Sequence, residues 1–299
     1  MTVLAPPDAR RPTAPPPGKP PSGTSPAGRT VARVVVFALL AGYALVSLYP
    51  FLWMVSAAFK TQLEVVRGGH LIPEDPTLDT LVDTWNRLDF FDYFLNSVLV
   101  TTCTVALTLA VYACAGYAFA VLRFKGRLAL SRMFMALLFV PGVTVMLPIV
   151  VLENEMGILG THLGLVLPFV NGTAPLSILL MTGAFSAIPG ELRESARVDG
   201  ASELRIFTSV YLPLSRPALI TVALLTAIPT WNEYLLTRVS LNDPATYTLP
   251  LGLQTLASES VPQYNNLMAG ALIIVVPVIL LFLFLQRYFM SGLVGAVKG

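Results

Sequence analysis

Six apolar stretches, each close to 20 residues long, dominate this chain and restrict what it can fold into. A helix needs about 20 predominantly apolar residues to cross the hydrocarbon core of a bilayer. Inside lipid every backbone polar group must be bonded within the protein, and a helix achieves this within one segment. The sequence therefore predicts an all-α polytopic membrane protein with six transmembrane helices, at about 34–58, 94–121, 130–152, 163–185, 217–236 and 267–289.

The scarcity of charge supports burial in a bilayer. Only 12% of the 299 residues are charged and 55% are hydrophobic, whereas soluble domains carry about 25% charged residues. The net charge of +2 and the scattered arginines also exclude a nucleic-acid partner.

Two of the stretches contain helix-breaking residues. Pro168, Gly172 and Pro175 are expected to bend or break the fourth helix, which neighbouring helices tolerate by bonding the freed carbonyls. The end of the fifth stretch is interrupted by Pro229, Asn232 and Glu233.

The distribution of positive residues predicts the orientation, because Lys and Arg are retained on the cytoplasmic side. With six spans and both termini cytoplasmic, 15 of the 19 Lys and Arg residues lie inside, all except Lys60, Arg67, Arg87 and Arg238. Residues 1–30 are basic, rich in proline and poor in large apolar groups, so they are expected to form a disordered cytoplasmic tail. Residues 31–299 then form the membrane domain.

The loop at 186–216, on the predicted inner side, carries the most informative pattern. It reads as two short helices with a bend at Asp199–Gly200, where glycine allows one helix to end sharply. Ser202 can cap the second helix, and Pro213 is expected to end it or redirect it toward the membrane. A narrow apolar stripe lies between them: Leu204, Phe207 and Val210.

These residues alone leave two interpretations of the loop open. One is a rigid helical knob that sits in a groove of a partner and moves with it. The other is an amphipathic loop that lies passively on the lipid headgroups.

A family resemblance favours the knob. Glu194-Ser-Ala-x-x-Asp199-Gly200-Ala201, followed by Phe207 and Leu212-Pro213, resembles the "EAA" coupling signature of ABC importer permeases. The one departure is Ser195, which replaces the first alanine of that signature with another small residue.

Further motifs across residues 31–299 resemble the maltose-type branch of sugar permeases, and its G-type subunit in particular. They are Asn96-Ser97, Ala115-Gly-Tyr-Ala-Phe-Ala120 before Arg123-Phe-Lys-Gly126, Trp231-Asn-Glu-Tyr234, Thr248-Leu-Pro-Leu-Gly252 and the ending in Val-Lys-Gly. The resemblance implies the type I ABC importer permease architecture. It also implies four kinds of partner: a second, F-type permease, two ATPase subunits, an extracytoplasmic solute-binding protein and membrane lipid, in a bacterial cell membrane.

The resemblance also assigns roles to residues. The coupling site would consist of Glu194, Ala196, Asp199, Gly200, Ala201, Phe207 and Pro213, and the C-terminal Val297, Lys298 and Gly299 would touch the ATPases. ATP and Mg would bind the partner subunits, and this chain itself contains no G-x-x-x-x-G-K-[ST] loop. We expect no catalytic residue, metal site or cofactor in this chain.

Candidate solute contacts are polar residues in or near the spans: Asn171, Thr173, Thr182, Asn232 and Glu233. Such groups tend to face the interior of the bundle, but they also serve as hydrogen bonds between helices, and both roles stay open.

Several other functions fit the sequence less well. An ion-driven secondary transporter would carry ionisable residues inside its spans, and only Glu233 comes close here. A membrane scaffold would not need the 191–213 segment. An intramembrane enzyme finds no support, since neither H-E-x-x-H nor G-x-S-x-G occurs. Among importers, related permeases for glycerol phosphodiesters or peptides remain alternatives.

Overall fold

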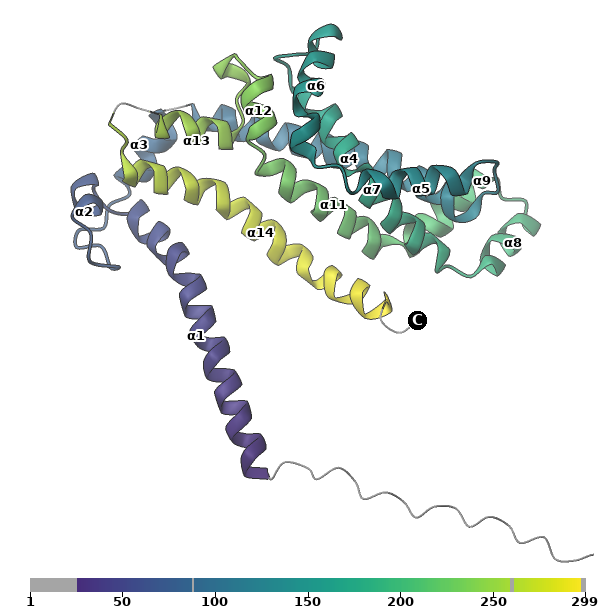
Figure 1. Cartoon of the computed structure of the whole chain (residues 1–299), viewed down its shortest axis with the longest axis horizontal. Helices are drawn as coiled ribbons and strands as arrows, with labels where there is room; N and C mark the ends of the chain where they lie inside the picture. Colours follow the sequence, from purple (N-terminus) through teal and green to yellow (C-terminus); the bar gives the residue numbers. More distant parts are fainter. Residues whose placement is uncertain (1–25, 88, 259–260, 297–299) are drawn as a thin grey trace, which may run out of the picture. The chain divides into compact units, whose positions relative to one another are not determined.

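The computed structural model describes residues 26–87, 89–258 and 261–296, and every regular element within these ranges is a helix (Figure 1). Of the predicted tail, residues 1–25 lie outside the described residues. Residues 26–30 are the first residues of helix α1 (Pro26–Ala58). The helix therefore begins before the predicted start of the membrane domain.

The chain divides into two units: the first ends at Phe51, and the second begins at Leu52. In the first unit the described residues all belong to α1. The second unit contains the last turns of α1 and all other elements: α2 (Gln62–Arg67), α3 (Asp79–Arg87), α4 (Phe90–Val121), α5 (Arg127–Leu137), α6 (Gly142–Glu155), α7 (His162–Ser186), α8 (Gly190–Val198), α9 (Glu203–Ile206), the π-helix η1 (Phe207–Tyr211), α10 (Leu212–Leu214), α11 (Arg216–Trp231), α12 (Leu235–Ser240), the 3₁₀ helix η2 (Pro244–Thr246), α13 (Leu249–Ala257) and α14 (Tyr264–Ala296).

Four helices are long and apolar enough to cross a membrane: α1 over Arg33–Ala58, α4, α7, and α14 over Tyr264–Phe284. Two further pairs meet the same criteria only together, and each pair is sharply bent. The angle is 104° between α5 and α6, and 78° between the Glu203–Leu214 helix and α11. By length and composition, the described chain thus has four candidate spans, or up to six if each bent pair is one span.

The third apolar stretch was expected to be one helix over 130–152, and this expectation was wrong. Helix α5 ends at Leu137, Pro141 has an extended backbone (ψ 128°), and α6 begins at Gly142. Proline lacks a backbone N–H and disfavours helical geometry in the residue before it, so the chain turns here.

The fifth helix ends five residues earlier than expected. Helix α11 stops at Trp231, and Asn232 is its C-cap. The carboxylate of Glu233 then accepts the backbone N–H of Leu236 at 2.9 Å and of Thr237 at 3.0 Å, which starts α12. Of the three residues predicted to interrupt the helix, Asn232 and Glu233 therefore end it and start the next, whereas Pro229 lies within α11.

The fourth helix does not break. Helix α7 runs without interruption through Pro168 and Pro175. Buried residues occur along its whole length, from Leu165 to Phe185, and much of this face packs on α4. Packing of this kind holds a proline-containing helix together when the local bonding is weakened.

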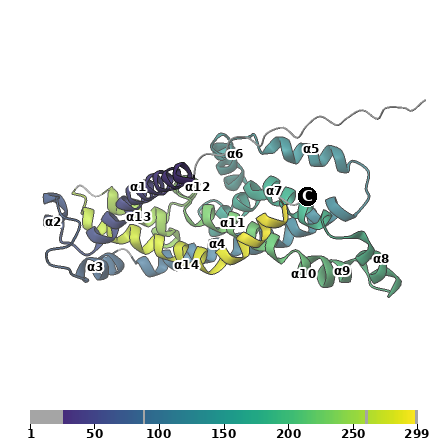
Figure 2. The ribbon, with the colours of Figure 1, turned by 90° about the horizontal axis from the view of Figure 1, so that it is seen from below.

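Helices α4, α7, α11 and α14 lie side by side in the second unit (Figure 2). Their packing still leaves most of their apolar surface uncovered. In α7, which is the most covered of the four candidate spans, 39% of the most apolar window is buried. Lipid or other chains must cover the rest, because apolar surface of this extent is not stable in water.

The segment between α11 and α14 folds back onto the start of α4. The side-chain amide of Asn96 donates to the carbonyls of Ala245 at 2.9 Å and Tyr247 at 3.0 Å. The hydroxyl of Ser97 accepts the N–H of Leu249 at 2.8 Å. The Asn96-Ser97 motif therefore fixes η2 and α13 against α4.

Candidate functional site

The segment with the coupling-like signature forms two short helices joined by a bend, as predicted. Helix α8 ends at Val198, and Gly200 has φ +80°. The N–H of Ala201 returns to the carbonyl of Ala196 at 2.9 Å. A Cβ on Gly200 would meet no atom within 4 Å, so the glycine is required by its backbone conformation and not by lack of space.

The second helix begins with the expected cap. The hydroxyl of Ser202 accepts the N–H of Arg205, and α9 starts at Glu203. Helix α9 continues through η1 and α10 as far as Leu214, and the chain bends at Ser215 before α11. Pro213 lies in the last turn of this helix, so the redirection comes two residues after the proline.

The signature residues have two different environments. Glu194, Asp199 and Gly200 are exposed, whereas Ala196 and Ala201 are half-buried against the core beneath them. The acidic side chains of the bend are therefore exposed, and its two alanines pack against the core.

Exposed apolar side chains accompany the bend. Val198 is 88% exposed and Leu204 is 70% exposed. The predicted stripe is therefore only partly correct, because Phe207 is buried and Leu204 points away from the core. The face that packs inward instead contains Ile206, Phe207 and Tyr211.

Phe207 belongs to a cluster of four aromatic rings at the ends of α4 and α7. Tyr117 has its ring centroid 5.1 Å from Phe207 and 5.0 Å from Tyr211. Phe185 lies 6.2 Å from Phe207 and 5.8 Å from Tyr211. Edge-on and tilted rings at these distances attract one another beyond the area that they bury.

Glu203 makes the strongest polar contacts of the segment, although its place in the first turn of α9 predicts no role for it. Its carboxylate is bound by Arg193 at 2.8 Å and by Arg197 at 2.7 Å, both from α8. It also accepts a hydrogen bond of 2.8 Å from the hydroxyl of Tyr117 in α4. The spacing of Arg193 and Arg197, one helical turn apart, is the only sequence signal that points to this arrangement.

These contacts act on the charge of Arg193. Partial burial lowers the pKa of its guanidinium, while the hydrogen bonds and charges of Glu203 and Tyr117 together raise it by more. The pKa of Arg193 is therefore raised overall, and the side chain stays cationic.

The five predicted solute contacts do not form one site. Thr173 bonds to Thr108 at 3.3 Å and to the Val170 carbonyl at 2.9 Å. Asn232 bonds to the Ile228 carbonyl at 2.8 Å, and Glu233 caps α12. Asn171 is exposed on α7, and Thr182 lines a cleft of about 540 Å³ beside Arg127 and Ser131 of α5.

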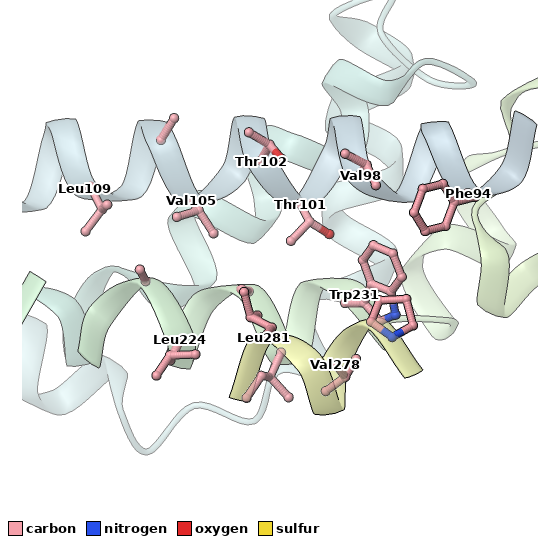
Figure 3. Close-up of a pocket in the computed structure, with 15 residues that line it drawn as sticks. Phe94, Val98, Thr101, Thr102, Val105, Leu109, Leu224, Trp231, Val278 and Leu281 are labelled. Atoms are coloured by element: carbon pink, nitrogen blue, oxygen red, sulfur yellow. The ribbon is translucent and has the colours of Figure 1, made fainter. Parts of the chain in front are cut away.

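A second groove, of about 490 Å³, lies between α4, α11 and α14 (Figure 3). Its lining is almost entirely apolar, with Phe94 and Trp231 at one end and the hydroxyls of Thr101 and Thr102 as its polar groups. None of the five predicted contacts lines it; Trp231, next to Asn232, does. The indole N–H of Trp231 is already bonded to the Ile274 carbonyl at 3.1 Å.

The remaining predicted sites concern the chain end and metals. Val297, Lys298 and Gly299 lie outside the described residues. Across the part of the chain that is described, no group of three His, Cys, Asp or Glu side chains is placed to hold a metal ion.

Comparison with known proteins identifies the family. Residues 112–294 match the family described as "Binding-protein-dependent transport system inner membrane component". The chain belongs to this family. The match includes α8, the Gly200 bend and α9, so the segment that carried the resemblance lies within the family region.

Several permeases of this kind resemble the chain over most of its length. The arabinooligosaccharides transport system permease protein AraQ of Halalkalibacterium halodurans is 34% identical, over 86% of this chain and 93% of the relative. The galactooligosaccharides transport system permease protein GanQ of Bacillus subtilis is also 34% identical, over 88% and 94%. The lactose transport system permease protein LacG of Rhizobium radiobacter is 32% identical, over 90% and 98%. The resemblance stated from the sequence is confirmed.

Solved structures share the fold. A chain in the crystal structure of a bacterial ABC transporter involved in the import of the acidic polysaccharide alginate superposes with a TM-score of 0.78 at 25% identity, covering 90% of this chain and all of that chain. A chain of an alginate transporter in complex with a pentasaccharide-bound periplasmic protein has a TM-score of 0.65 at 16% identity, over 87% and 95%. The chain is therefore a multi-pass inner-membrane transport component with an ABC importer permease fold.

Proposed function

We propose that this chain is a permease subunit of an ATP-driven, binding-protein-dependent importer of sugars or oligosaccharides in a bacterial cell membrane. It has six spans, with each bent pair counted as one, and both termini are cytoplasmic. It contributes half of the translocation path and couples to ATPase subunits through residues 191–213.

The substrate class rests on the relatives. The permeases at 32–34% identity are named for arabinooligosaccharides, galactooligosaccharides and lactose. A structural neighbour belongs to a transporter of the polysaccharide alginate. All four solutes are carbohydrates, and this agreement supports a saccharide as the solute of this chain.

The single observation that carries the coupling role is the exposed, rigid bend at Gly200. Glu194 and Asp199 face outward beside Val198 and Leu204, whose apolar side chains are left uncovered. Exposed apolar groups framed by charges are typical of a surface that a partner covers. The ion pairs from Arg193 and Arg197 to Glu203 hold α8 and α9 at a fixed angle, so this surface can move as one body.

The charge distribution supports the orientation. Arg193, Arg197 and Arg205 surround the bend, and positive residues are retained on the cytoplasmic side. ATPase subunits act on that side, which is where the bend must lie if it is to meet them.

The other partners follow from the same assignment. A second permease of the F type supplies the other half of the path, an extracytoplasmic binding protein delivers the solute, and ATP and Mg bind the ATPase subunits. Val297, Lys298 and Gly299 are proposed as a further contact with the ATPases. The solute path remains assigned to the neighbourhood of Asn171, Thr173, Thr182, Asn232 and Glu233.

The test uses the assembled transporter, purified with its partner subunits and reconstituted in proteoliposomes with the binding protein. Glu194→Lys reverses the charge of the exposed face, and Gly200→Pro cannot adopt φ +80°. Each variant is expected to lower ATP-dependent saccharide uptake by about tenfold or more, with unchanged insertion into the membrane.

Glu155→Lys is the matched control, because it reverses an exposed carboxylate at the far end of α6. It is expected to leave uptake near the wild-type rate. Wild-type uptake by Gly200→Pro would refute the coupling role, and copurification without any ATPase would refute the assignment to an ATP-driven importer.

A further inference from the structure

Two routes lead from the Gly200 bend into the membrane helices, one along the chain and one across to a neighbouring helix. The first is the chain itself, which continues from α9 through η1 and α10. This route bends by 78° at Ser215 before α11 begins. Ser215 is buried, but its hydroxyl has no hydrogen-bond partner within the described structure. Backbone bonds of 3.0 Å continue on both sides of Ser215, but the change of direction means that α9 and α11 do not share one axis along which a displacement can pass.

The second route is lateral and passes through one carboxylate. Oxygen Oε1 of Glu203 binds Arg193 at 2.8 Å and Arg197 at 2.7 Å, and Oε2 accepts the Tyr117 hydroxyl at 2.8 Å. Oε1 bonds only toward α8, whereas Oε2 joins α4 and also accepts a longer bond of 3.4 Å from Nε of Arg193. Short charge-assisted bonds of this kind are stronger than neutral ones and fix geometry.

Tyr117 is well placed to receive a displacement. It is 6% exposed, and its ring is surrounded by Phe185, Phe207 and Tyr211 at centroid distances of 5.0–6.2 Å. Its hydroxyl reaches out of this cluster to Glu203. A movement of Glu203 must therefore move the ring or break the bond.

Helix α4 does not move alone at this point. Directly before Tyr117, Gly116 lies so close to α7 that a Cβ on it would be 2.5 Å from the Cβ of Met181. Tyr117 also packs edge-on against Phe185 of α7. Closely packed helices shift together, because packed interfaces do not deform continuously.

From these contacts we infer that Tyr117 and Glu203 are positioning residues that transmit the displacement of the Gly200 bend to the α4–α7 pair. The inference rests on the proposed coupling function and adds the receiver of the motion to it. Since the bond lies between α9 and α4, its loss leaves only the aromatic packing to connect the bend with the pair, and it does not touch the ATPase surface or the solute.

The test measures saccharide uptake and ATP hydrolysis in the same proteoliposomes of the assembled transporter. Tyr117→Phe keeps the ring and removes only the bond to Glu203. The amount of solute imported per ATP hydrolysed is expected to fall by about threefold to tenfold. Half-saturation by the loaded binding protein is expected to stay unchanged.

Tyr112→Phe is the matched control. Tyr112 is also buried in α4, and its hydroxyl donates to the Val170 carbonyl of α7 at 3.1 Å, with no link to the bend. Each variant loses one hydrogen bond from a buried tyrosine hydroxyl, and because the bond of Tyr117 is charge-assisted, Tyr117→Phe is expected to lower thermal stability at least as much as Tyr112→Phe does. Only Tyr117→Phe is expected to lower import per ATP. Equal import ratios for the two variants would overturn the inference.

A double mutant separates transmission from general damage. Glu203→Gln removes the charge that Arg193 and Arg197 bind, and it is expected to lower import per ATP as well. Combining it with Tyr117→Phe should then give an effect smaller than the product of the two single effects, since both act on one connection. Multiplicative effects would overturn the inference.

If Glu194→Lys abolishes uptake while Tyr117→Phe behaves as Tyr112→Phe does, the coupling function stands and only the route through Tyr117 falls.

Discussion

Gly116 of α4 and Met181 of α7 are in direct backbone-level contact: a Cβ on Gly116 would lie 2.5 Å from the Cβ and 3.0 Å from the carbonyl carbon of Met181. Neither neighbouring atom is the end of a flexible side chain. The approach of the two helices at this point therefore depends on the absence of a side chain at residue 116, as at small-residue interfaces in membrane proteins generally.

Gly116→Ala is accordingly expected to destabilise the protein, by about 1–3 kcal/mol for overpacking. Gly183→Ala is the control, because a Cβ on this glycine of α7 would meet nothing within 4 Å. It should be neutral, or stabilising by up to about 1 kcal/mol through helix propensity. Thermal unfolding in detergent compares the two variants, and equal midpoints would contradict the close approach.

A second prediction concerns Glu153 at the end of α6. The side chain is only 2% exposed, and neither carboxylate oxygen makes a hydrogen bond within the described structure. It faces the hydroxyl of Ser240, which is likewise buried and unpaired. An unpaired buried charge is costly, so Glu153→Gln, which keeps the shape without the charge, is expected to raise stability by about 1 kcal/mol.

The measurement is again the thermal midpoint, with Glu155→Gln as the control, because that carboxylate is exposed two residues further along α6. The control is expected to leave the midpoint unchanged. If Glu153→Gln lowers the midpoint and abolishes uptake, the carboxylate has a binding role and is not an unsatisfied group.

Much of the fold follows from composition and local pattern. Hydropathy locates α1, α4, α7 and α14, because a long apolar run needs no tertiary information to be identified as a span. Gly200 and Ser202 likewise locate the bend and the cap of α9, since φ > 0 and N-capping are local requirements.

The errors arise where hydropathy overlooks a proline and where tertiary contacts decide. The turn at Pro141 interrupts an apolar run that hydropathy reads as continuous. Packing on α4 keeps α7 whole despite Pro168 and Pro175. The bond between Tyr117 and Glu203 joins residues 86 positions apart, and no periodicity in one sequence indicates such a pair. The buried carboxyl of Glu153 was missed because it lies one residue beyond the predicted third span.

A third prediction concerns the segment between α11 and α14. The amide of Asn96 holds it by two bonds, to the carbonyls of Ala245 and Tyr247. Asn96→Ala leaves both carbonyls without this donor and is expected to free η2 and α13, at about 1–3 kcal/mol of local stability.

Limited proteolysis or hydrogen exchange over residues 241–257 measures the effect, since local opening exposes the backbone there. Asn242→Ala removes an exposed amide from the same segment and serves as control. Equal protection in the two variants would show that Asn96 does not anchor the segment.

The fourth prediction concerns the backbone at Gly200, where φ is +80°. An alanine in this region is strained by about 1–2 kcal/mol, although its Cβ would meet no atom. Gly200→Ala is therefore expected to tilt α8 relative to α9 or to loosen the contacts of Arg193 and Arg197 with Glu203, and to lower uptake less severely than Gly200→Pro does. Gly190→Ala is the control at the start of α8, because this glycine has open space around it and does not have a positive φ.

A residue that tolerates positive φ should restore function, so Gly200→Asn is expected to transport better than Gly200→Ala. The order glycine, asparagine, alanine, proline in uptake rate would tie transport to this one dihedral angle, whereas equal rates for asparagine and alanine would show that the bend is not held by it.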